Sequence, residues 1–139
     1  MARRLAEAEV AVRPQAEPGV LARVRLCVTA WLIPGLGHVL LGRKWRALIL
    51  FVSIVSMFLL GLAMKGEFFS AHSASYLQTL GYCGELCVGV AMPAANFFGY
   101  SGDAFFASSD YGTAFLVAAG MLNVLAILDA YDIAMGRKP

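Results

Sequence analysis

Four long runs without charged residues constrain this chain more than any other feature of its sequence. Residues 47–64 and 111–128 are continuous apolar runs, whereas residues 26–42 and 86–102 are interrupted by glycine and proline. A helix that spans a bilayer needs about 20 mostly apolar residues, with about 17 as the lower limit. Hydrophobic residues make up 60% of the chain and charged residues 14%, far below the roughly 25% charged residues of a soluble domain. The sequence therefore predicts an all-α integral membrane protein, a helical bundle with about four hydrophobic segments.

The length of 139 residues allows one domain. We predict a polar N-terminal tail over residues 1–18 and a single transmembrane helical domain over residues 19–139, with segments at about 26–42, 47–64, 81–102 and 111–133. The tail does not read as a signal peptide, because no small-residue cleavage site follows an early apolar core. After Pro18, apolar residues recur at helical spacing and predict an amphipathic lead-in to the first segment. The net charge of +2 is too small to suggest a nucleic-acid partner.

The first segment contains a predicted helix break, formed by Pro34, Gly35 and Gly37, with His38 directly after it. Proline lacks an amide hydrogen and clashes with the preceding turn, so a helix should stop or kink at Ile33. A break at membrane depth survives only where protein or a water-filled cavity covers it, so we expect this one to face protein. The third segment carries several glycines and a proline. We predict a span there, with an interfacial or re-entrant segment as the alternative.

The distribution of Lys and Arg near the segment ends predicts the topology. With four spans, most basic residues and both termini lie in the cytoplasm, and the protein is placed in a bacterial inner membrane. That arrangement leaves the basic interface cluster, Arg43, Lys44 and Arg46, on the outside. However, basic residues flank the first segment on both sides, as they would in a re-entrant hairpin that puts Arg25 and Arg43 on the same side. Both arrangements stay open.

Two stretches resemble known families. "PGLGHVLLGRKWRALILF" is similar to the first half of a TM2-type domain, a two-helix module with a glycine-rich turn before Gly-Arg. The C-terminal "DYGTAFLVAAGMLNVLAILDAYDIAMGRK" resembles small uncharacterised polytopic membrane proteins of an acidobacterial type. TM2-type modules carry an aspartate near the end of their second helix, which corresponds to Asp129. Their two helices are adjacent in sequence, whereas another candidate segment separates the two halves here. The resemblance implies a membrane scaffold or accessory role and no defined activity.

Polar residues within the apolar segments are candidates for function, because charges at the bilayer centre are costly. His38, Glu85, Asn123 and Asp129 stand out. Asp129 and Asp132 are three residues apart, so they share one helix face near its end. We interpret them as interfacial residues that pair with arginines. The expected partners are Arg23 and Arg25, joined by Arg43 and Arg46 if the first segment is re-entrant.

Asn123 belongs to a stripe of small residues along the last segment, with Ala119, Ala126 and Ala130. Such stripes let helices approach closely in lipid, so Asn123 is interpreted as a helix-packing residue. His38 is interpreted mainly as a structural histidine that covers the carbonyls freed by Pro34. The alternative is a metal or pigment ligand, since imidazole is a common axial ligand.

No catalytic residues are predicted, and the protein is not expected to be an enzyme. "GYSG" over residues 99–102 matches the G-x-S-G of rhomboid-type proteases, but no histidine base follows Ser101. We predict a non-catalytic accessory or structural subunit of a multisubunit membrane complex, with photosynthetic or respiratory electron transfer as candidate settings. Its partners would be other membrane subunits and the lipid bilayer. No cofactor is required, and the candidate ligands are lipid, a chlorophyll-type pigment or haem. The alternative is a small channel, carrier or proton-handling protein that uses Glu85 and Asp129.

Overall fold

Six helices and no strands make up residues 19–69 and 75–138, the part of the chain that the computed structural model describes. The all-α prediction is confirmed for these residues, and the predicted tail over residues 1–18 lies outside them. The helices are α2 (Val20–Leu32), α3 (Leu36–Leu40), α4 (Lys44–Ala63), α5 (Tyr76–Leu86), α6 (Ala91–Phe97) and α7 (Ser109–Ala134).

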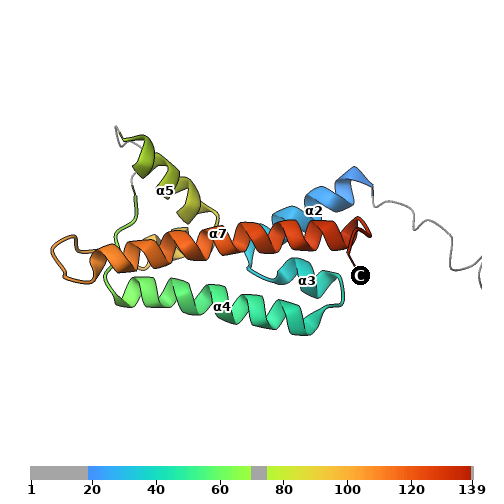
Figure 1. The fold of residues 1–139 in the computed structure, drawn as a ribbon, viewed down its shortest axis with the longest axis horizontal. Helices are drawn as coiled ribbons and strands as arrows, with labels where there is room; N and C mark the ends of the chain where they lie inside the picture. Colours follow the sequence, from blue (N-terminus) through green and yellow to red (C-terminus); the bar gives the residue numbers. More distant parts are fainter. Residues whose placement is uncertain (1–18, 70–74, 139) are drawn as a thin grey trace, which may run out of the picture.

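The two long helices, α4 and α7, pack side by side in antiparallel directions (Figure 1). They have 20 and 26 residues, or about 30 and 39 Å at 1.5 Å per residue. By length and composition, both could cross a membrane. A Cβ on Gly61 of α4 would lie 2.8 Å from the Leu116 side chain of α7, so the missing side chain permits close packing. Four spanning helices are not confirmed, because the first and third predicted segments are each divided into two shorter helices.

The first segment folds back on itself as a helical hairpin (residues 20–40, the first hairpin). Pro34 follows the last turn of α2, and Gly35 has a φ of +80°, a left-handed conformation that glycine adopts without a Cβ clash. Helix α3 then returns along α2, so that a Cβ on Gly37 would lie 2.8 Å from the Cβ of Ala30. The chain thus enters and leaves this hairpin at the same end of the bundle (Figure 1).

The third segment forms a second hairpin (residues 76–97), which opens at the opposite end of the bundle. Its turn contains Gly89 with a φ of +79°. Just after α6, the Tyr100 hydroxyl donates hydrogen bonds to the carbonyl oxygens of Leu62 and Gly66, at 3.2 and 2.8 Å. Helix α6 therefore runs back to the end of the bundle where α4 finishes. There, α5 leans away from α7 (Figure 1).

Both halves of the described chain repeat one order of elements: a helix, a turn, a shorter helix, a second turn and a long helix. The residues with positive φ mark corresponding positions after each helix. They are Gly35, Gly42 and Lys65 in the first half, and Gly89, Gly99 and Gly136 in the second. Each half therefore attaches one broken hairpin to one long helix.

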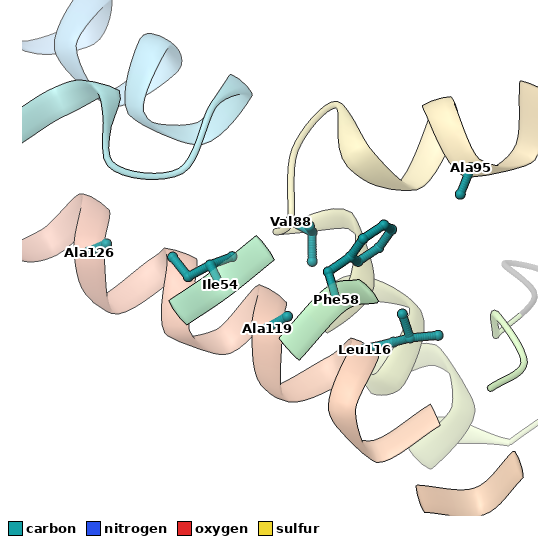
Figure 2. Close-up of a cluster of buried hydrophobic side chains, with 7 residues drawn as sticks. All are labelled: Ile54, Phe58, Val88, Ala95, Leu116, Ala119 and Ala126. Carbon is teal, nitrogen blue, oxygen red and sulfur yellow. The ribbon is translucent and has the colours of Figure 1, made fainter. Parts of the chain in front are cut away.

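The apolar core joins both long helices to the second hairpin (Figure 2). Ile54 and Leu116 are fully buried between α4 and α7. Val88, which lies in the turn between α5 and α6, packs in the same cluster. The other members of this cluster are Phe58, Ala95, Ala119 and Ala126. Burying such side chains stabilises the bundle by roughly 1.5–3 kcal/mol for each large aliphatic or aromatic residue in water.

The basic interface cluster lies at the same end of the bundle as the end of α7, because the turn at Pro34 and Gly35 reverses the chain. Figure 1 shows that α4 starts at the end of the bundle where α7 finishes. The four-span arrangement, which put Arg43, Lys44 and Arg46 on the opposite side from the C-terminus, does not fit this geometry. The hairpin alternative does.

Candidate functional site at the hairpin junction

The tips of the two hairpins meet against the middle of α7, and we call this contact the hairpin junction. The last turn of a helix leaves carbonyl groups without intrahelical partners, and the ends of α2 and α5 both lie here. Asn123 of α7 is fully buried between them. Its Nδ2 donates to the carbonyl oxygens of Trp31, at 3.3 Å, and of Cys87, at 2.8 Å. One carboxamide therefore caps both broken helices.

Two further hydrogen bonds connect the tips directly. The indole Nε1 of Trp31 donates to the carbonyl oxygen of Leu86 at 3.1 Å, and the backbone N–H of Val90 donates to that of Leu32 at 3.3 Å. Glycine permits this approach, because a Cβ on Gly89 would collide with the Trp31 carbonyl oxygen. The two hairpins open at opposite ends of the bundle, and their tips meet at this junction. There, the carbonyl groups that each helix break leaves unpaired accept hydrogen bonds from other parts of the same chain.

A polar cluster attaches the first hairpin to the end of α7. His38 of α3 is 1% exposed, and its Nε2 lies 3.0 Å from Oδ2 of Asp129. The other carboxylate oxygen accepts a hydrogen bond from Lys138 Nζ at 2.7 Å, and this bond raises the pKa of Lys138. Asp132 lies 3.5 Å from Arg137 and 3.9 Å from Lys138.

The residues that contact Asp129 are not the arginines that the sequence indicated. Arg23, Arg25, Arg43 and Arg46 were expected, whereas the structure pairs Asp129 with a histidine and with a lysine just beyond α7. The "PGLGH" stretch and the terminal "LDAYDIAMGRK" contain all three residues. Nothing in their spacing indicates that they meet, because α3 reaches α7 only after the chain has reversed.

Glu85 of α5 makes a separate connection. It is 1% exposed, and its Oε2 accepts the backbone N–H of Phe69 at 2.9 Å. Its Oε1, like Oδ1 of Asn123, has no hydrogen-bond partner within the described residues. The sequence singled out Glu85 but did not indicate its partner, which is a main-chain group in the segment that follows α4.

The observed contacts at these sites are hydrogen bonds and ion pairs between parts of the chain. Within residues 19–69 and 75–138, no three side chains among His, Cys, Asp and Glu come close enough together to hold a metal ion. Nε2 of His38, one of the two ring nitrogens that could ligate a pigment or haem, is engaged by Asp129. The stripe of Ala119, Asn123, Ala126 and Ala130 is buried against the other helices.

The fold and the hairpin junction together define a class of all-α protein. Two helices of membrane-spanning length pack against two hairpins of short helices, and the tips of these hairpins are in contact. Residues 25–139 match a family described as "Family of unknown function (DUF6677)", and the chain belongs to this family. The prediction of an uncharacterised family is thereby confirmed, and the TM2-type and acidobacterial resemblances stay predictions. No curated protein and no solved structure matches the sequence significantly.

Proposed function

We propose that the chain is a non-catalytic accessory subunit that stabilises a larger multisubunit membrane complex. One observation carries this proposal. Among the described residues, four polar or charged side chains are buried, and each one bonds to a distant part of the same chain. Three of them are His38, Glu85 and Asn123. The fourth is Ser109, whose hydroxyl donates to the Lys65 carbonyl oxygen at 3.0 Å. The buried polar groups therefore hold elements together.

The position of the charges supports placement in a membrane. Of the charged side chains in the described residues, only Glu85 lies in the middle of the bundle, where it is buried. The outer face of α4 is apolar and exposed, as Leu48, Ile49 and Val52 show. Contiguous apolar surface of this kind is unfavourable in water. A break inside hydrocarbon requires cover by protein, and the hairpin junction supplies it.

The hairpins also support an orientation with both termini in the cytoplasm. Because the first hairpin returns the chain to its starting side, one end of the bundle holds seven basic residues and the other holds only Lys65, counting described residues. An excess of Lys and Arg marks the cytoplasmic side of bacterial inner-membrane proteins. The seven are Arg23, Arg25, Arg43, Lys44, Arg46, Arg137 and Lys138.

The contacts favour this role over a channel, carrier or proton-handling protein. Such a protein would use Glu85 and Asp129 as steps of one polar path. In the structure, Glu85 bonds to Phe69, while Asp129 bonds to His38 and Lys138, so the two carboxylates share no partner. A pigment or haem bound through Nε2 of His38 would have to displace Asp129 from that atom. Other membrane subunits and lipid are the proposed partners, and no cofactor is needed for this role.

Isolation of the untagged protein from its native membrane tests the proposal. In a mild detergent, particle mass, co-purifying subunits and the absorption spectrum are recorded together. We expect a large particle with a fixed set of partner subunits, and pigment bands would identify an electron-transfer complex. A particle near 14.9 kDa plus detergent, or a small homo-oligomer, would contradict the proposal.

A further inference from the structure

A groove of about 1010 Å³ separates α5 from α7, at the end of the bundle opposite the C-terminus. Its floor is apolar and comes from both helices. Leu77 and Leu80 line it from α5, and Val117 and Met121 line it from α7. From Asp110 to Met121 the groove follows α7 for about 17 Å, at 1.5 Å per residue.

The two carboxylates of the groove lie at its rim near the start of α7, and the polar residue that α5 contributes is the neutral Gln78. Glu67 and Asp110 line this rim together with Ser109 and Thr113, and none of the described residues that line the groove is a Lys or Arg. Both carboxylates are exposed, and neither forms an ion pair within the described part of the chain. The groove thus combines an acidic rim with an apolar floor.

We propose that this groove binds an amphiphile with a cationic head, of the aminolipid class. The ammonium group lies at Glu67 and Asp110, and the alkyl chain lies along Leu77, Val117 and Met121. This site is distinct from the hairpin junction, and the proposal does not depend on the role as a subunit.

The two parts of the groove contribute differently to binding. Burial of the alkyl chain against the apolar floor supplies most of the affinity, in proportion to the area removed from water. The carboxylates select the head, because exposed ion pairs add little energy but reject like charge. Phospholipids carry a phosphate that two carboxylates would repel. The selected head is therefore a net cation.

The experiment uses the full chain in nanodiscs of zwitterionic phosphatidylcholine and two nitroxide-labelled probes with the same octadecyl chain. One probe has a trimethylammonium head and the other a sulfate head. Electron paramagnetic resonance measures the fraction of each probe that the protein immobilises. We expect the ammonium probe to bind about fivefold more tightly than the sulfate probe, as two weak ion pairs predict.

Matched variants test the role of the rim. Glu67→Gln combined with Asp110→Asn should abolish the preference for the ammonium head, while Asp103→Asn should preserve it. Asp103 is an exposed carboxylate at the same end that does not line the groove. Met121→Trp, which fills the floor, should weaken binding of both probes.

Several results would overturn the proposal. Equal immobilisation of the two probes by the wild-type chain is one, and an unchanged preference in the double variant is another. Cross-linking of Met121→Cys to a helix of another polypeptide, without uptake of the ammonium probe, would assign the groove to a protein partner. Because the probes are measured on the isolated chain, these results are independent of whether the protein belongs to a larger complex.

Discussion

Val90 donates its backbone N–H to the carbonyl oxygen of Leu32, and this bond of 3.3 Å joins two hairpins that open at opposite ends of the bundle. The carbonyl lies at the end of α2, and the donor lies just before α6. Each hairpin thus supplies partners for the backbone groups that the break in the other exposes. Neither helix break has all of its backbone groups hydrogen-bonded without the other hairpin. We therefore expect the two hairpins to form and unfold together.

Gly89→Ala should destabilise the protein much more than Gly99→Ala. Both glycines have positive φ, so both substitutions carry the left-handed penalty of about 1–2 kcal/mol. Only at position 89 would the new Cβ collide with the Trp31 carbonyl oxygen, whereas nothing lies within 4 Å at position 99. Thermal unfolding in detergent, followed by circular dichroism, measures the difference. Equal melting temperatures for the two variants would show that the tips are not in contact.

Asn123→Ala should cost about 1–3 kcal/mol, because it leaves two carbonyl groups of the part-buried hairpin junction without this donor. Those groups belong to Trp31 and Cys87. Asn96→Ala, at an exposed position on α6, is the control and should stay within about 0.5 kcal/mol of wild type. Chemical denaturation in mixed micelles measures both variants. A neutral Asn123→Ala would remove the capping role that we assign to this side chain.

His38→Ala and Asp129→Ala should show an interaction energy of about 0.5–3 kcal/mol in a double-mutant cycle, as expected for residues in direct contact. The pair includes a side chain that is 1% exposed, so solvent screens it weakly. Asp132→Ala provides the comparison, because its contacts with Arg137 and Lys138 are on the surface and should contribute little to stability. Additive effects of the first pair would disprove their direct contact.

Single cysteines should report a hairpin topology. In a background without native cysteines, Lys44→Cys and Lys138→Cys should react with a membrane-impermeant maleimide from the cytoplasmic side only. Asp103→Cys, at the other end of the bundle, should react only from the outside. Intact cells and inverted vesicles provide the two sides. Labelling of positions 44 and 138 from opposite sides would restore the four-span arrangement.

The long helices and the position of the first helix break could be predicted from the sequence, because local residue composition determines both. The uncharged runs 47–64 and 111–128 correspond closely to α4 and α7, and Pro34 indicated a break by its covalent structure. The direction in which the chain leaves the break was not predictable. The left-handed turn at Gly35 fits against α4, where a Cβ would lie 2.6 Å from the Ala47 carbonyl oxygen. That contact exists only in the folded chain.

The candidate residues were identifiable, but their partners were not. His38, Glu85 and Asn123 stand out because polar groups are rare in apolar segments. Their hydrogen bonds connect positions 91, 16 and 36 residues apart, to Asp129, Phe69 and Cys87 respectively. Local periodicity carries no information about pairings over such distances, and charge counting favours arginine over histidine as the partner of an aspartate.

The bond between His38 and Asp129 can form only late in synthesis. Ninety-one positions separate the two residues, so at about 5–20 residues per second the ribosome needs on the order of 5–18 s to add the second after the first. During that interval the first hairpin lacks the carboxylate of Asp129 and the carboxamide of Asn123. The nascent chain therefore carries an incompletely satisfied break until α7 has been synthesised.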